Sequence, residues 1–188
     1  VRARLDANPP LTENTHRVVV ANGRFVPELS SVPAGVRVAS LLDPAADTDG
    51  DGDLGRDSDD PLTLANVGLF EGGPVIRVEE NAAGSIEIVQ VIGDGVLVMA
   101  RAAVFVAPGA TAHFVERVLG GVGAVTNTLI ELSVPEKAHV EWIRFAEGRS
   151  ADATNLSTLH TRVEEKARLE HLTVSTGEGL ARAQVFCF

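Results

Sequence analysis

The stretch that most suggests chemistry alternates acids with glycines, Asp47-Thr-Asp-Gly-Asp-Gly-Asp-Leu54. A calcium loop of the EF-hand type needs oxygen ligands at positions 1, 3 and 5, glycine at position 6 and a bidentate acid at position 12. Counting from Asp47, the sequence supplies Asp49, Asp51 and the glycine, but position 12 is Ser58. The stretch is therefore a weak calcium-loop candidate, with Asp47, Asp49 and Asp51 as the metal ligands.

The acidic charge of the chain is concentrated around this stretch. Residues 43–60 contain eight Asp and one Arg, which leaves only a small part of the net charge of −10 for the rest of the chain. That many unpaired carboxylates repel one another and favour an extended, hydrated loop. We therefore expect residues 43–61 to form an acidic flexible loop, and we prefer solvation over calcium binding as its explanation.

Other residue types that could do chemistry are isolated in the sequence. The single cysteine, Cys187, rules out an internal disulfide and fits the reducing cytoplasm. It stands between two phenylalanines, so we expect it to be buried. Ser157 and His160 have no acidic partner at a fixed offset. We assign no catalytic residue, no cofactor-binding residue and no enzyme activity.

Two patterns exclude further partner classes. The longest apolar run, residues 95–110, is interrupted by Arg101 and is too short for a membrane span. Basic residues form no stripe with interleaved aromatics, so neither nucleic acid nor membrane is an expected partner.

The elements that position these residues have mostly β character. β-branched residues flank Asn22-Gly23, which predicts a hairpin over residues 17–26, and residues 36–42 form a further candidate strand. From Val78 onward a Val-x-x-x-Ala turn recurs, with starts at residues 78, 106, 134 and 163, each followed by a β-rich run. Repeats of about 28 residues predict an all-β parallel β-helix, with an evenly spaced β-sandwich as the alternative.

The repeats align into columns of similar residues. One column holds Phe114, Trp142 and His171, and we expect an aromatic stack there. The next column holds Val115, Ile143 and Leu172. Because both columns are mostly apolar, we expect a bend or bulge near residues 113–115. A further column places His113 with Glu141 and Glu170, which predicts a surface ion-pair ladder.

Several sequence segments, in the same order along the chain, resemble segments of one protein family. They are Val18-Val-Val-Ala-Asn-Gly-Arg-Phe-Val-Pro-Glu-Leu-Ser30, Leu64-Ala-Asn-Val-Gly-Leu-Phe70 with Pro74-Val-Ile-Arg-Val78, Pro108-Gly-Ala-Thr-Ala112, Asn155-Leu-Ser-Thr-Leu-His160 and Gly177-Glu-Gly-Leu-Ala-Arg182. They are similar to the SufB/SufD family of the SUF iron-sulfur cluster assembly system, and closer to its SufD branch. The hairpin followed by Pro-Glu-Leu-Ser is the most specific part.

The resemblance implies a right-handed parallel β-helix of the SufBD-core type. It implies a scaffold that pairs with SufB and works with the ATPase SufC through regions outside this chain, and an iron-sulfur cluster held transiently by the assembled complex. Residues 1–16 would be a remnant of the N-terminal segment, and residues 17–188 a partial β-helix core, the N-terminal half of that of the family. None of the cluster-assembly residues of the family is transferred to this chain.

Two alternative functions stay open. One is a SufB-type paralogue, and another is a calcium-binding or polysaccharide-acting β-helix protein. Against the last, Trp142 is the only Trp and the chain has no Tyr, so little surface is available for stacking on sugars. An open coil edge would also allow a homodimer.

Overall fold

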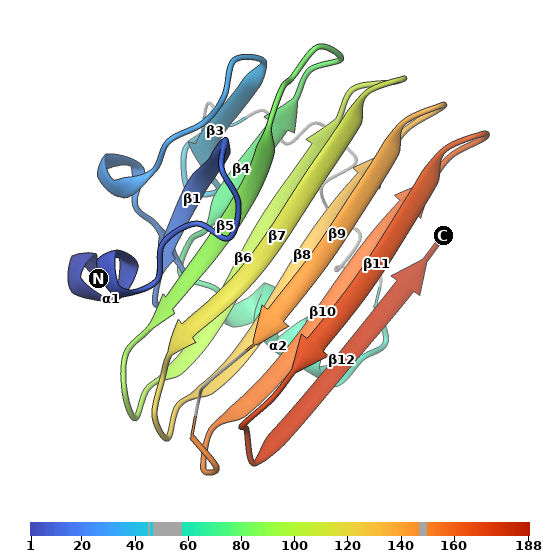
Figure 1. Cartoon of the computed structure of the whole chain (residues 1–188). Coiled ribbons are helices and arrows are strands. Elements are labelled where there is room, and N and C mark those ends of the chain that lie inside the picture. Colours follow the sequence, from blue (N-terminus) through green and yellow to red (C-terminus); the bar gives the residue numbers. More distant parts are fainter. Residues whose placement is uncertain (45, 47–57, 147–149) are drawn as a thin grey trace.

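The described part of the chain forms two facing sheets of six strands each (Figure 1). This computed structural model describes residues 1–44, 46, 58–146 and 150–188. The calcium-loop candidates Asp47, Asp49 and Asp51 lie outside the described residues. Sheet A has the strand order β11-β9-β7-β5-β1-β2, and sheet B has the order β12-β10-β8-β6-β4-β3.

The described elements follow in chain order: α1 (Arg2–Ala7), β1 (Thr15–Ala21), β2 (Arg24–Phe25), the 3-10 turn η1 (Pro27–Leu29), β3 (Val36–Ser40), α2 (Pro61–Leu69), β4 (Pro74–Val78), β5 (Ser85–Ile92), β6 (Leu97–Val106), β7 (Thr111–Gly120), β8 (Val125–Val134), β9 (His139–Ala146), β10 (Thr154–Val163), β11 (Arg168–Ser175) and β12 (Leu180–Cys187).

Successive strands alternate between the two sheets, so each pair from β5–β6 to β11–β12 makes one coil of a solenoid (Figure 1). Strands of neighbouring coils pair in parallel, with His113 between Ser85 and Glu141 in register. The Val-x-x-x-Ala turns are the crossovers from sheet B to sheet A, because β4, β6, β8 and β10 each end at the valine. The predicted parallel β-helix is confirmed, and the β-sandwich alternative is excluded.

The N-terminal end of the solenoid contains the antiparallel pairs. Strands β1 and β2 form the predicted hairpin, whose turn residues Asn22 and Gly23 have φ angles of 46° and 83°. Those left-handed angles are typical of a two-residue hairpin turn, which explains the Asn-Gly pair. Strand β1 also pairs in parallel with β5 from Thr15 onward, so the sheet begins inside the predicted N-terminal segment 1–16.

The two helices among the described residues lie against the outer faces of the sheets. Helix α1 places Leu5 against a small apolar cluster on the outside of β5 and β7. Helix α2, which the sequence analysis did not predict, begins after Asp60, whose carboxylate accepts a hydrogen bond from the Thr63 amide at 2.9 Å. Such a cap with proline at the first helical position is a strong start signal. No helix in the described part of the chain is long and apolar enough to cross a membrane.

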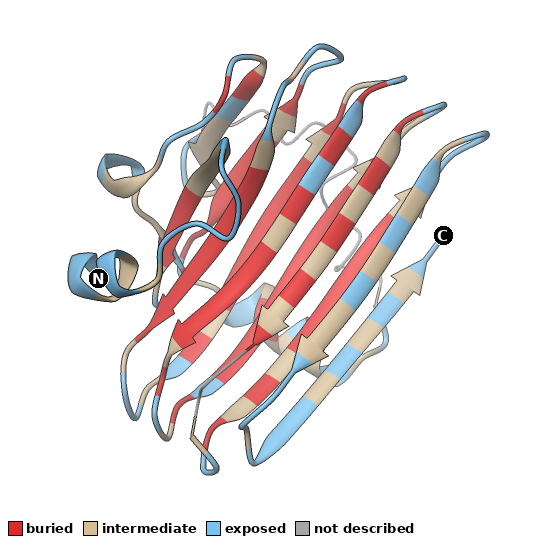
Figure 2. Cartoon of the chain, viewed as in Figure 1, coloured by how far each residue is buried: buried red, intermediate tan, exposed pale blue. Residues whose placement is uncertain are grey.

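Buried residues extend along the strands of the inner coils (Figure 2). The main core lies between the two sheets, next to the Val-x-x-x-Ala turns. Its largest side chains are Trp142 and Phe114, whose rings stack with centroids 4.9 Å apart. They stack because the same position of consecutive coils faces inward at the same height, as the column of the sequence predicts. His171 follows in the same register, half-buried.

The expected bend near residues 113–115 is absent. Strand β7 pairs with β5 and with β9 without interruption, and its side chains alternate strictly through this region. Val115 and Ile143 are half-buried and Leu172 is exposed, all on the outer face of sheet A. The prediction was wrong because an apolar column on an outer face needs no bulge to be tolerated.

Candidate functional site

A network of buried polar side chains interrupts the apolar interior. On sheet A, Gln90 Nε2 donates to Glu116 Oε1 at 2.7 Å, and Arg144 Nε donates to the same oxygen at 3.0 Å. Glu116 and Arg144 are 1% and 4% exposed and lie directly opposite each other on β7 and β9. A buried ion pair of this kind offsets the cost of desolvating both charges only through close, well-directed contacts.

The network crosses from sheet A to sheet B. Arg144 Nη2 donates to Asn155 Oδ1 at 3.1 Å, and Asn155 Nδ2 donates to Glu178 Oε1 at 3.0 Å. Thr128 Oγ1 donates to Gln90 Oε1 at 3.3 Å. These bonds tie strands of both sheets together and separate the main core from a smaller apolar cluster around Ile92. The interior therefore consists of two apolar compartments with a polar layer between them.

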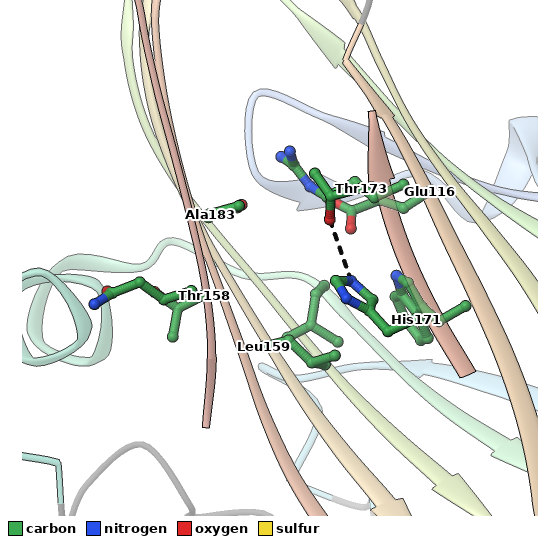
Figure 3. Close-up of a pocket in the computed structure, with 11 residues that line it drawn as sticks. Glu116, Thr158, Leu159, His171, Thr173 and Ala183 are labelled. Carbon is green, nitrogen blue, oxygen red and sulfur yellow. Dashed lines mark hydrogen bonds and ion pairs between the residues drawn. The ribbon is translucent and has the colours of Figure 1, made fainter. Parts of the chain in front are cut away.

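A small pocket lies where this polar layer reaches the last coil (Figure 3). It is lined by Glu116, Trp142 and Arg144 from the inner strands and by His171 and Thr173 from β11. The His171 imidazole and the Thr173 hydroxyl are 3.3 Å apart. Burial lowers the pKa of His171 below 6.5; the nearby Glu116 raises it and Arg144 lowers it. The imidazole is therefore neutral near pH 7, beside an internally neutralised ion pair.

Ser157 and His160 do not form a catalytic pair. Ser157 lines the pocket, whereas His160 packs against Phe186 at a ring-centroid distance of 4.7 Å. Residues three apart on a strand face opposite sides of the sheet, so their separation alone forbids a contact. The Ser157 hydroxyl is 3.5 Å from the Arg182 carbonyl oxygen, a marginal hydrogen bond. The pocket thus offers hydrogen-bond donors and acceptors without an activated nucleophile among its described residues.

The outer face of sheet A carries a second buried charge group. Glu87 is fully buried and forms ion pairs with Arg17 at 2.6 Å and with Arg117 at 3.0 Å. The arginines also donate to backbone carbonyls of the N-terminal segment, Arg17 to Asn8 and Arg117 to Pro9. Residues 5–10 therefore cover this part of the sheet and hold the charges away from water.

Farther along the same face, the predicted ladder of His113, Glu141 and Glu170 is exposed. His113 Nδ1 lies 2.8 Å from Glu141 Oε2, which confirms the first step of the ladder. Glu170 instead contacts His139 at 3.2 Å and Arg168 at 2.7 Å. The register places all of these residues on neighbouring strands β7, β9 and β11.

The last coil, β11 and β12, has a different environment from the inner coils (Figure 2). Both strands lie at the ends of their sheets, and Leu172, Leu180 and Val185 are exposed. Cys187 is exposed as well, so the expected burial of its side chain is wrong. Its neighbouring phenylalanines suggested a core, but no described strand pairs with the far side of β12 to cover it.

The buried polar layer was not predicted from the sequence. The pattern that indicates this layer is a charged residue two positions after an inward-facing aromatic residue, as in Phe114 with Glu116 and Trp142 with Arg144. Strict alternation would have placed both charges inside the solenoid. The expected bulge near residues 113–115 hid that pattern, because a bulge reverses the direction of every later side chain.

Comparison with known proteins identifies the family. No curated protein matches the chain. The family model described as "SUF system FeS cluster assembly, SufBD core domain" matches residues 89–188, more than half of the chain. The match begins within β5 and covers the later coils, the polar layer and the exposed histidine–glutamate column. The chain therefore belongs to the SufBD core domain family of the SUF system for FeS cluster assembly.

Proposed function

We propose that this protein is a scaffold subunit of the SUF assembly complex, of the SufD type, that pairs with SufB and works with the ATPase SufC. The observation that carries the proposal is the family match over residues 89–188, which coincides with the regular coils of the solenoid. A scaffold holds partners in fixed positions, and stacked parallel coils make a stiff, elongated surface for that purpose.

The assignment to the SufD branch rests on the landmarks near the N-terminus. The Pro-Glu-Leu-Ser segment forms η1 and folds back on β1, where the Ser30 hydroxyl accepts a hydrogen bond from the Val19 amide at 2.9 Å and donates to the Val26 carbonyl at 2.7 Å. The motif thus satisfies backbone groups along the edge of strand β1. A SufB-type role is the alternative within the family.

The chemistry of the interior fits a scaffold better than an enzyme. Glu116 and Arg144 neutralise each other, and the pocket beside them has room for about one water molecule. We propose no catalytic activity for the chain. The iron-sulfur cluster would be cargo of the assembled complex, which we place in the cytoplasm.

Strands β11 and β12 of the last coil present open edges to a further strand. Strands β11 and β12 each pair with one neighbour only among the described strands, and their exposed side chains include Leu172, Leu180 and Val185. Unpaired strand edges with apolar side chains readily add another strand. The next coil of a longer β-helix would use these edges, and a second copy of the chain, which would give a homodimer, is the alternative occupant.

Co-expression tests the proposal. The full-length protein would be produced with SufB and SufC from the same genome, with an affinity tag on SufC. We expect the full-length protein to be recovered with SufC, in a complex that also contains SufB. Absence from every SufC-containing complex would overturn the proposal. Assembly in the place of SufB would instead assign the SufB-type role.

A further inference from the structure

The outer face of sheet A gathers metal-ligating side chains from two adjacent strands. The ligand atoms of His139, Glu141 and Glu170 all lie within 4.8 Å of one another. His139 and Glu141 belong to β9, where both odd-numbered positions face outward, and Glu170 belongs to β11, directly opposite Glu141. One imidazole and two carboxylates therefore converge on one point above a regular sheet.

Two further side chains contact this group. His113 Nδ1 lies 2.8 Å from Glu141 Oε2, so it can hold that carboxylate by a hydrogen bond from β7. Arg168 Nη2 lies 2.7 Å from Glu170 Oε1 and already places a positive charge at the edge of the group. Arg168 is largely exposed, and exposed ion pairs of this type are weak, so a stronger cation can displace it.

We propose that His139, Glu141 and Glu170 form a surface site for a divalent first-row transition metal ion such as Zn²⁺, with His113 as a positioning residue for Glu141. A neutral imidazole nitrogen with carboxylate oxygens suits Zn²⁺ and Fe²⁺, whereas Ca²⁺ and Mg²⁺ prefer oxygen ligands alone. Three protein ligands leave at least one coordination position for water. The ion is therefore held in an open, exchangeable site.

The geometry requires only side-chain movement. Ligand atoms bound to one tetrahedral Zn²⁺ at about 2.0–2.2 Å are about 3.4 Å from one another. The ligand atoms here lie within 4.8 Å of one another, so they must approach by at most about 1.4 Å. All three side chains are at least partly exposed and can rotate that far, while the paired strands keep their Cα atoms in place. This proposal is independent of the SufD assignment.

Zinc titration by calorimetry tests the site. The full chain would carry Cys187→Ser, because the exposed thiol is itself a zinc ligand. Excess Ca²⁺ in the buffer would occupy sites made of oxygen ligands alone, including any formed by the acidic residues 43–60. We expect the chain to bind one Zn²⁺, and the double variant His139→Ala with Glu170→Gln to bind it at least about tenfold more weakly.

Two single variants should act in opposite directions. Arg168→Ala removes the competing cation and should strengthen Zn²⁺ binding, whereas His113→Ala should weaken it by less than the double variant does. Glu165→Gln is the matched control, because Glu165 is an exposed acid on the turn before β11 with a lysine partner, and it should change nothing. In an NMR titration, the imidazole signals of His139 should shift, and those of the buried His160 should not.

Two results would overturn the proposal. One is the absence of Zn²⁺ binding to the Cys187→Ser chain, and the other is an unchanged affinity in the double variant. Thermal unfolding of each variant would show that the fold is retained, which is expected because the substituted side chains lie on the surface.

Discussion

Strands β7 and β9 carry one ion pair on each face. The two pairs have similar distances but differ in burial and in their neighbouring side chains. Inside the solenoid, Arg144 and Glu116 are 3.0 Å apart and almost completely buried. Outside, His113 and Glu141 are 2.8 Å apart, with nearly half of each side chain exposed. Each pair joins the same two strands, three residues apart along the chain. They lie on opposite faces because successive side chains of a strand point to opposite sides of the sheet.

Burial decides what a charge can do in this fold. The inner pair has no access to solvent ions and is bonded to Gln90 and Asn155, so it fixes how neighbouring coils and the two sheets align. The outer pair costs little to form and little to break. Its side chains are available for a ligand, which is why we place structure on the inner face and binding on the outer face.

The largest expected effect comes from breaking the inner pair. Glu116→Leu leaves the Arg144 guanidinium buried without its carboxylate and should lower the free energy of unfolding by about 3–5 kcal/mol. Urea unfolding would measure the change. Adding Arg144→Met should recover most of the loss, because an apolar pair can replace a buried ion pair. A loss below about 1 kcal/mol for the single variant would mean that the inner pair contributes no more to stability than an exposed ion pair does, and would contradict this expectation.

A substitution of Glu87 tests whether the contribution of an ion pair to stability depends on its burial or on the face of the sheet that carries it. Glu87 lies on the outer face, like His113, but under the N-terminal segment. Glu87→Gln keeps hydrogen-bonding capacity but removes the charge that faces Arg17 and Arg117, so it should cost about 1.5–3 kcal/mol in the same assay. The control is Glu79→Gln, whose partner Arg37 is exposed. Equal, small effects for both variants would contradict the account.

A smaller effect is expected from the pH dependence of His171. Because burial lowers the pKa of His171 in the folded chain below 6.5, the unfolded chain binds more protons as the pH falls through 6.5. Stability should therefore be greater above pH 6.5 and decrease below it. Urea unfolding on both sides of this pH should show a smaller decrease for His171→Phe than for the natural chain. The same decrease in both proteins would mean that His171 is not the group responsible.

The smallest expected effect is at the outer pair. Glu141→Gln should change the free energy of unfolding by less than about 1 kcal/mol, because the pair with His113 is exposed. The same variant should clearly weaken Zn²⁺ binding, since it removes a charged ligand. Thermal unfolding and calorimetry on one preparation would measure both properties. A large loss of stability would show that the outer column is structural after all.

The sequence predicted the coils well because each coil repeats the same turn. Val78, Val106 and Val134 recur at almost constant spacing, and a parallel solenoid is the structure that places equivalent residues in stacked columns. The Asn22-Gly23 hairpin was predictable for a local reason, the positive φ angles of its turn.

What the sequence did not predict depends on contacts between distant segments. Helix α2 begins with the local signal Asp60-Pro61, but it is only nine residues long. Asn66 fixes it to sheet B through hydrogen bonds to the carbonyls of Ala100 and Asn127. The burial of Glu116 depends on Gln90 and Asn155, which lie on other strands. The exposure of Cys187 depends on which strands flank β12, and that is a property of the assembled sheet.

The subunit composition of the complex that this protein forms shows whether it is a scaffold of SUF assembly. Native mass spectrometry of the full-length protein, co-expressed with SufB and SufC from its own genome, would give the subunit composition. The scaffold account predicts a species that contains this protein together with SufB and SufC. Finding the protein only as a monomer or a homodimer, while SufB and SufC assemble without it, would contradict the account.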